Sequence, residues 1–258
     1  MEEREAANLA FLAGEWPLHP ARPTLIFIHG AGGSSSFWSA QLDALLDVAN
    51  TIAVDLPGHG RSPHPGRKKI EDYTQVVAKF IKTLGPPWPV PVGISMGGAI
   101  AQKLLLDHPG LCSAGVLVAT GARLAVLPVI LELIEKDFKK YIELKGQMAV
   151  SPKTPRELIQ PVLDDTALCD PSVVLGDFQA CGAFDERKRV KEIGVPVLVI
   201  TADGDLLTPP KFGGELTGKI PKAHRVHIND AGHLVPVEKP DEVNTAIREF
   251  LSYACEVR

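Results

Sequence analysis

A serine lies at the centre of a glycine-rich pentapeptide, Gly93-Ile94-Ser95-Met96-Gly97, which fits the pattern G-x-S-x-G. In this pattern the serine occupies the tip of a sharp strand-to-helix turn, so its hydroxyl projects from the backbone as a nucleophile. Glycine is needed at the flanking positions because the two arms of the turn nearly touch. Residues 88–92 form an apolar, strand-like run and residues 98–106 have helical periodicity, so the sequence around the motif predicts the structural context that it requires.

A serine hydroxyl needs a base to take its proton, and the base needs an acid to orient it. His233 follows an apolar run at 224–228 and lies in a glycine-containing loop before a predicted helix. The G-x-S-x-G scaffold places the acid between the serine and the histidine in the chain. Asp203 and Asp205 both follow the apolar run at 195–200, and spacing alone does not separate them. Either could instead be a turn aspartate that accepts backbone hydrogen bonds.

Acyl transfer also requires donors for the oxyanion. In this scaffold one is the backbone N–H of the residue after the nucleophile, here Met96, and the other comes from the loop at 29–33, His-Gly-Ala-Gly-Gly. Glycines in that loop would let the backbone approach a substrate carbonyl closely. The loop lacks the Gly-Lys-Ser/Thr ending of a phosphate-binding Walker loop and the last glycine of a dinucleotide fingerprint.

The composition is that of an ordinary globular enzyme. The chain has 258 residues, of which 45% are hydrophobic and 22% charged, with a formal net charge of −4. We expect no nucleic-acid partner, because there is no basic excess, and no membrane span, because no apolar run is long enough. The four cysteines form no C-x-x-C pair and no metal-binding spacing with histidine, so we expect reduced thiols. Acyl transfer by a serine needs neither a metal nor an organic cofactor, and we expect none. The acidic N-terminus does not resemble a signal peptide, which predicts a cytoplasmic protein.

Strands and helices alternate along the chain. Near-continuous apolar runs predict strands at residues 24–28, 51–54, 90–92, 113–119, 195–200 and 224–228, and amphipathic patterns predict helices at 37–48, 70–84, 98–108 and 241–253. The pattern indicates an α/β fold with a mostly parallel central sheet and helices on both faces. Pro89 and Pro91 lack backbone donors, so we expect the strand before Ser95 to be shortened or locally unpaired.

The alternation stops between Gly121 and Gly194. A helical stripe runs from about residue 124 to 145, and prolines punctuate further short helical pieces. We predict a core formed by residues 1–121 and 192–258, with residues 122–191 inserted as a helical lid over the carboxyl ends of the strands. The alternative is that these helices only shield the sheet. The apolar lid residues, Leu127 among them, favour an apolar acyl group in the substrate.

Taken together, these motifs resemble the α/β-hydrolase superfamily, in particular its serine esterases with a helical lid. The resemblance rests on His29-Gly30 and on residues 55–62, 93–98, 203–209, 231–233 and 238–240. It implies Ser95 as nucleophile, His233 as base and Asp205 as acid, because the family acid usually stands shortly before a Thr-Pro loop. It further implies Ala31 as the second oxyanion residue.

The implied activity is hydrolysis of carboxylic esters of small to medium acyl compounds through an acyl-enzyme, with a small-molecule ester as the substrate and neither nucleic acid nor a membrane as a partner. We expect Gly30, Arg123 and Leu127 to contact the substrate. A carbon–carbon bond hydrolase or enol-lactonase of aromatic catabolism is the alternative, since Arg123 could bind a carboxylate, although the predicted lid contains no tryptophan. A non-catalytic ligand receptor and a membrane-active lipase also remain open. The sequence does not indicate an oligomeric state.

Overall fold

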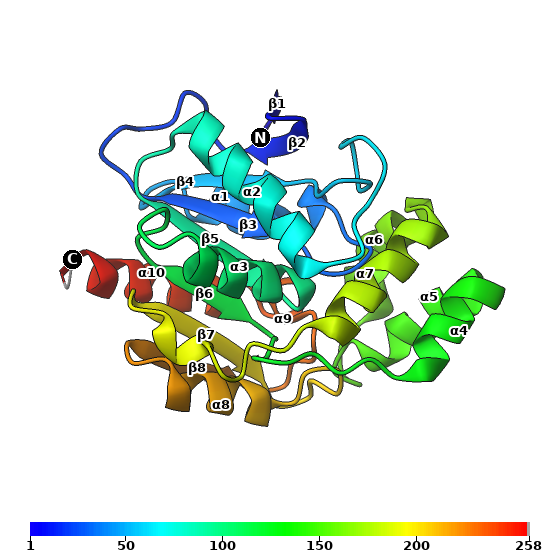
Figure 1. Cartoon of the computed structure of the whole chain (residues 1–258). Coiled ribbons are helices and arrows are strands. Elements are labelled where there is room, and N and C mark those ends of the chain that lie inside the picture. Colours follow the sequence, from blue (N-terminus) through cyan, green and yellow to red (C-terminus); the bar gives the residue numbers. More distant parts are fainter. Residues whose placement is uncertain (257–258) are drawn as a thin grey trace.

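The computed structural model describes residues 1–256, which fold around one eight-stranded sheet (Figure 1). The strands are β1 (Glu2–Ala6), β2 (Leu9–Ala13), β3 (Thr24–Ile28), β4 (Asn50–Val54), β5 (Pro89–Ile94), β6 (Gly115–Val118), β7 (Val197–Ala202) and β8 (Ala223–Ile228). They lie in the order β1-β2-β4-β3-β5-β6-β7-β8, with β1 and β2 antiparallel to their neighbours and the others parallel. The predicted α/β fold with a mostly parallel sheet is confirmed.

Helices cover both faces of the sheet. The α-helices are α1 (Ser39–Ala44), α2 (Ile70–Leu84), α3 (Met96–Asp107), α4 (Pro128–Lys136), α5 (Phe138–Met148), α6 (Arg156–Leu168), α7 (Pro171–Ala183), α8 (Pro210–Lys219), α9 (Val235–Glu238) and α10 (Pro240–Glu256), with short 3-10 turns η1 (Ser35–Trp38) and η2 (Val190–Glu192). Among residues 1–256, none of the helices combines the length and the apolar character that crossing a membrane would require.

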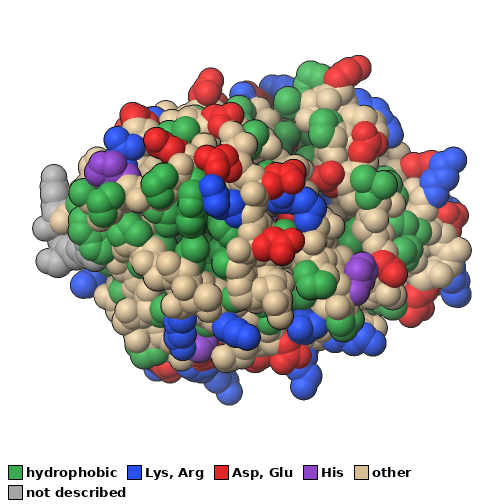
Figure 2. Space-filling model, turned by 90° about the horizontal axis from the view of Figure 1, so that it is seen from above, with side chains coloured by type: hydrophobic (Ala, Val, Ile, Leu, Met, Phe, Trp, Pro, Cys, Tyr) green, Lys and Arg blue, Asp and Glu red, His purple; other side chains and the backbone are tan. Residues whose placement is uncertain are grey.

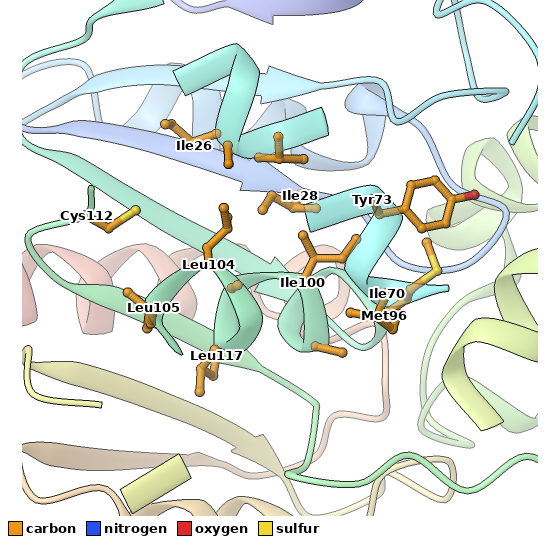
Figure 3. Close-up of a cluster of buried hydrophobic side chains, with 14 of the residues drawn as sticks. Ile26, Ile28, Ile70, Tyr73, Met96, Ile100, Leu104, Leu105, Cys112 and Leu117 are labelled. Atoms are coloured by element: carbon orange, nitrogen blue, oxygen red, sulfur yellow. The ribbon is translucent and has the colours of Figure 1, made fainter. Parts of the chain in front are cut away.

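The core is divided by the sheet into two layers because successive side chains of a strand point to opposite faces. On β3, Ile26 and Ile28 join a cluster that includes residues of α2 and α3, whereas Leu25 and Phe27 join a second cluster with α1 and α10. Figure 3 shows the first cluster, with Ile100 and Leu104 of α3 packed against β3. All five residues of β3 are buried, as expected for a strand covered on both faces.

An N-terminal hairpin was not predicted. β1 and β2 are joined by Ala7 and Asn8, whose φ angles are 52° and 67°, as in a two-residue hairpin turn. The sequence signal is weak because the usual Asn-Gly or Asp-Gly pair is absent and β1 is mostly polar and exposed.

The prediction for the proline-containing strand is confirmed for its local loss of pairing but not for its length, since β5 spans six residues. β5 pairs with β3 from Pro89 to Gly93, but its pairing with β6 begins only at Val92. Because Pro89 and Pro91 are two residues apart, their missing donors belong to the same side of the strand. β5 therefore stays hydrogen-bonded to β3 along most of its length, and this pairing fixes the segment that leads to Ser95.

The inserted helices are α4 to α7, which lie between β6 and β7 and extend to one side of the sheet (Figure 1). The predicted continuous helix over 124–145 is wrong: α4 ends at Lys136 and α5 starts at Phe138. Asp137 separates them with φ −153° and ψ 73°, and its side chain accepts a hydrogen bond from the Lys140 N–H, as an N-cap does. The helix predicted at 37–48 is also shorter, because α1 ends at Ala44.

Candidate active site

Ser95 lies at the turn between β5 and α3, with a φ of 54° and a ψ of −115°. A positive φ is unfavourable for a residue with a side chain and costs of order 1–3 kcal/mol, so neighbouring groups must hold it. The Ser95 N–H donates to the Val118 carbonyl oxygen at 3.1 Å, and the Thr120 hydroxyl donates to the Ser95 carbonyl oxygen at 2.9 Å. These bonds to β6 and the residues after it fix the turn, while the Ser95 side chain stays partly exposed and lines a cavity.

Two glycines allow the strand and the helix to approach each other at this turn. A Cβ placed on Gly93 would lie 2.1 Å from the Gly97 carbonyl oxygen, and one placed on Gly97 would lie 2.2 Å from the Ile28 carbonyl oxygen. Both obstacles are backbone atoms, so a rotamer change cannot relieve the overlap.

We expect Gly93→Ala to lower the free energy of unfolding by at least about 3 kcal/mol, the upper end for overpacking a buried site. Urea denaturation followed by circular dichroism would measure it. Gly218→Ala is the matched control, because no atom lies within 4 Å of a Cβ at that position of α8. An equal, small effect of both substitutions would contradict the steric explanation of the turn.

His233 and Asp205 come from the loops that follow β8 and β7. The Asp205 carboxylate oxygens lie 3.1 Å and 3.0 Å from His233 Nδ1. Asp205 also accepts hydrogen bonds from the backbone N–H groups of Leu207 and Thr208, at 2.9 Å and 2.8 Å, and from the Thr208 hydroxyl at 2.7 Å. Asp203, in contrast, is exposed and accepts a bond from the Ala231 N–H at 3.3 Å. The structure thus brings Asp205, rather than Asp203, to the histidine.

The surroundings keep Asp205 ionised. Burial by itself would raise the pKa of this carboxyl, but the charge of His233 and the hydrogen bonds from His233 and Thr208 outweigh burial, so the pKa lies below its ordinary value. A carboxylate at this position accepts the His233 Nδ1–H and leaves Nε2 unprotonated in the neutral ring. The imidazole is therefore held in the tautomer that a general base needs.

Ser95 and His233 line the same cavity, which has a volume of about 340 Å³. No hydrogen bond joins their side chains within residues 1–256, and in enzymes without substrate such a bond is often long and tightens only when substrate binds. The cavity lies between the carboxyl ends of the strands and the inserted helices. Its wall is mostly apolar, with side chains that include Phe37, Leu124, Leu127, Ile130, Leu144, Met148, Val162, Phe178 and Phe212.

The other predicted site residues occupy three kinds of position. Gly30, Ala31 and Leu127 line the cavity. Met96 is buried at the first position of α3, where a backbone N–H has no acceptor within the helix. Arg123, however, is exposed, does not line the cavity and forms a backbone bridge with Asp185, so its position does not support a substrate contact.

A buried polar network, which the sequence analysis missed, ties the loop at 29–33 to the inserted helices. Asp177 of α7 is fully buried and accepts hydrogen bonds from the Gly32 N–H at 2.9 Å, from His59 Nε2 at 2.8 Å and from the Tyr73 hydroxyl at 2.6 Å. On α6, Asp165 accepts a second set of hydrogen bonds from Ser34, at 2.6 Å, and from Ser36. Two carboxylates of the inserted helices thus hold the loop that contains Ala31.

The two buried histidines near this loop carry different charges. His59 places both ring nitrogens on acceptors, Pro57 O and Asp177 Oδ2, which requires the imidazolium form. Burial lowers the pKa of His59, but the charge and hydrogen bond of Asp177 outweigh it and raise the pKa overall. His29 donates through Nδ1 to Gly30 O and accepts the Leu56 N–H at Nε2, so it is neutral; burial and the nearby His59 lower its pKa to about 3.

We expect Asp177→Asn to cost about 3 kcal/mol of stability, because breaking a buried ion pair leaves its partner uncompensated. The raised pKa of His59 stabilises the native state below the ordinary histidine pKa, and this contribution is lost as pH rises through the folded-state value. The cost of the substitution should therefore be larger at pH 6 than at pH 9, as measured by urea denaturation. Asp164→Asn, an exposed change on α6, is the control. A cost independent of pH would show that the ion pair does not contribute.

Several polar residues of the site have no recognisable sequence signal. The Thr208 hydroxyl donates a hydrogen bond to Asp205 and lies 3.2 Å from His233 Nδ1. In the sequence its role is indicated only by its position before Pro209, in the segment that resembles the family. Nothing distinguishes Asp177 from other acids of a helical segment. Within residues 1–256, no group of three or more His, Cys, Asp or Glu side chains is placed to hold a metal ion.

Comparison with known proteins places this arrangement in context. The model of the alpha/beta hydrolase family matches residues 25–246. A putative non-heme bromoperoxidase of Mycobacterium tuberculosis is 28% identical over 250 residues, which cover 88% of this chain and 93% of that protein. A pimeloyl-[acyl-carrier protein] methyl ester esterase of Vibrio atlanticus is 27% identical, covering 84% and 90%. The solved structure of a thermophilic esterase has a TM-score of 0.82 and 35% identity, covering 95% of this chain and 94% of the esterase.

Proposed function

Because the chain belongs to the alpha/beta hydrolase family, we propose that it is a serine hydrolase that cleaves carboxylic esters of small to medium acyl compounds. The observation that carries the proposal is the shared cavity: Ser95 and His233 both line it, and Asp205 holds the other nitrogen of His233. Two relatives are named as esterases, which supports the same reaction class.

The proposed reaction has two steps. The Ser95 hydroxyl attacks the ester carbonyl carbon while His233 Nε2 takes its proton, and the oxyanion accepts hydrogen bonds from the N–H groups of Ala31 and Met96. His233 returns the proton to the departing alcohol, which leaves an acyl group on Ser95. Water then attacks the acyl-enzyme with His233 again as base. The bond between Ser95 and the acyl group breaks, His233 returns the proton to the Ser95 oxygen, and the acid is released. Asp205 orients the ring and stabilises the imidazolium formed in each step.

The cavity wall supports an acyl group of moderate size. Its apolar side chains come from the inserted helices and from the loops after the strands, and a volume of about 340 Å³ lies within the range of small-molecule sites. We propose that the inserted helices, within residues 122–191, act as a lid over the carboxyl ends of the strands, as the sequence pattern predicts. Arg123 is exposed and does not line the cavity, so its position does not support the carboxylate contact on which the carbon–carbon bond hydrolase alternative relied.

The location proposed from the sequence is the cytoplasm. The cysteines are free within residues 1–256, and Cys112 and Cys181 are buried with pKa values raised by burial, to about 12 for Cys112. Unpaired thiols of this kind are typical of a reducing compartment.

The test combines turnover with covalent labelling. We expect hydrolysis of p-nitrophenyl acetate and butyrate well above the buffer rate, and inactivation by a fluorophosphonate with its adduct on the peptide that contains Ser95, as located by mass spectrometry. Binding of esters without turnover would favour a ligand receptor, and labelling at another residue would refute the assignment of the nucleophile. A preference for highly polar neutral acyl groups would contradict the role of the apolar wall.

A further inference from the structure

The wall of the cavity has an unbalanced charge. Two of its lining residues are lysines, Lys145 and Lys211, and none of its lining residues within 1–256 is an aspartate or glutamate. The outer surface is different, because acidic and basic side chains are interspersed across the face seen in Figure 2. Lys211 is exposed, whereas Lys145, on α5, is half-buried and lines the cavity. A cation in an otherwise apolar cavity creates a preference for an anion there.

Lys145 has no carboxylate partner. Its Nζ donates to the Thr166 hydroxyl at 2.6 Å, and Thr166 in turn donates to the Val162 carbonyl oxygen at 2.9 Å. Within the described part of the chain, Nζ of Lys145 forms no ion pair with a carboxylate, and its hydrogen bond goes to the Thr166 hydroxyl. The acids of the neighbouring helices, Asp165 and Asp177, accept hydrogen bonds from other groups instead. An ammonium has three donors, so Lys145 retains hydrogen-bonding capacity that no protein group uses.

A second unused donor lies one helical turn away. Tyr141 is 2% exposed and lines the cavity, and its hydroxyl has no hydrogen-bond partner within residues 1–256. Tyr141, Leu144, Lys145 and Met148 all line the cavity, with the spacing i, i+3, i+4 and i+7 that defines one face of a helix. A buried hydroxyl without a partner is unusual in a folded protein and calls for a ligand or water.

We propose that Lys145 and Tyr141 form a subsite for a carboxylate group of the substrate. The subsite rests on the proposed ester hydrolysis and narrows it: the ester carries a carboxylate on either its acyl or its alcohol portion, separated from the ester bond by an apolar spacer. A carboxylate has two oxygens, of which one can accept from the ammonium and the other from the phenol. The apolar wall around them suits a methylene or aromatic spacer.

The preference should depend on pH. Burial lowers the pKa of Lys145 to about 8, so the ammonium is present below that pH and is lost above it. The titratable groups around Lys145 are Tyr141 on its own helix, Asp165 and Cys169 at the end of α6, Asp177 on α7 and, beyond them, His29. Groups such as these affect the cleavage of a carboxylated ester and of a neutral ester alike. The ratio of the two kcat/KM values at each pH therefore removes their contribution and leaves the effect of the carboxylate.

The test measures kcat/KM for two pairs of esters. In the first pair the acyl portion differs: p-nitrophenyl hydrogen adipate against p-nitrophenyl heptanoate. In the second the alcohol portion differs: 4-carboxyphenyl butyrate against phenyl butyrate. We expect Lys145→Met to lower the ratio of kcat/KM for the carboxylated ester to that for the neutral ester roughly 10- to 100-fold in one pair, as expected for loss of a hydrogen bond between charged groups. Tyr141→Phe should lower the same ratio of kcat/KM values by about 3- to 10-fold.

Lys139→Met is the matched control, because it removes the same charge from an exposed position of the same helix. It should leave the ratio unchanged.

The ratio in the wild type should fall between pH 6.5 and pH 9.5, and that change should disappear in Lys145→Met. The pair that responds identifies the portion of the ester that carries the carboxylate.

Binding distinguishes failure of the subsite from failure of the proposed reaction. Isothermal titration with monomethyl adipate in the Ser95→Ala background measures binding without hydrolysis of the methyl ester, and we expect Lys145→Met to weaken that binding by about tenfold or more. If the wild type cleaves neutral esters but neither pair of esters responds to Lys145→Met, the subsite is refuted and ester hydrolysis stands. If no ester is cleaved but binding depends on Lys145, the subsite stands and the hydrolytic function fails.

Discussion

We expect Ser95→Ala to lower kcat for p-nitrophenyl butyrate by about a million-fold, the size of effect seen when the nucleophile of a serine hydrolase is removed. The substitution deletes one oxygen and keeps Cβ, so the positive φ at this position is no less favourable for alanine than for serine. The glycines on either side are untouched. The free energy of unfolding should therefore change by no more than about 0.5 kcal/mol.

Ser252→Ala is the control for this substitution. Ser252 is an exposed serine of α10 whose hydroxyl donates only to the carbonyl oxygen one helical turn before it. The control should keep full activity and should still be inactivated by the fluorophosphonate, whereas Ser95→Ala should not be labelled. Removal of the nucleophile typically lowers the rate far more than about a hundredfold. If Ser95→Ala kept more than about one hundredth of the wild-type rate, Ser95 would be excluded as the nucleophile.

The second large effect is expected from Asp205→Asn, which should lower kcat about ten-thousand-fold, as replacing the acid of such a triad with its amide does elsewhere. The amide keeps the shape of the side chain. However, its NH₂ would face His233 Nδ1 and donate to it, because an oxygen is needed for the N–H groups of Leu207 and Thr208. The ring would then carry its proton on Nε2 and could not accept the proton of Ser95.

Asp203→Asn is a matched control, because the residue stands two positions away and accepts a bond from the Ala231 N–H rather than from His233. We expect it to change kcat by less than about threefold, as for other exposed substitutions away from the reacting groups. If Asp203→Asn lost activity and Asp205→Asn kept it, the assignment of the acid would be reversed.

Asp205→Asn should also change the response of stability to acid. The pKa of Asp205 is lowered in the folded protein, so its carboxylate stabilises the native state above the ordinary value of 3.8, and this contribution is lost as pH falls through the folded-state value. Urea denaturation between pH 6 and pH 3 should therefore show a steeper loss of stability in the wild type than in the variant. If stability fell with pH equally in the wild type and in the variant, the hydrogen bonds and the charge around Asp205 would not stabilise its carboxylate.

Much of the site was predictable from local sequence. The elbow at Ser95 is a local structure, because the close approach at Gly93 and Gly97 is imposed within a few residues and one neighbouring strand. The parallel strands were predictable because burial on both faces demands continuous apolar runs, such as β3. One local feature was not predicted: the helix expected over 124–145 is divided at Asp137, whose side chain caps α5 although the apolar stripe continues across it.

The sequence by itself determined the fold class, the nucleophile motif and the two loops that bear the histidine and its acid, because each depends on apolar periodicity or on backbone sterics that act between near neighbours. Only the tertiary structure decided which side chains face the cavity. Asp203 and Asp205 differ only in the direction that their loop gives them, Arg123 turns outward, and Lys145 turns inward. The orientation of a loop or of an inserted helix is set by packing against distant segments, and no short stretch of sequence contains that information.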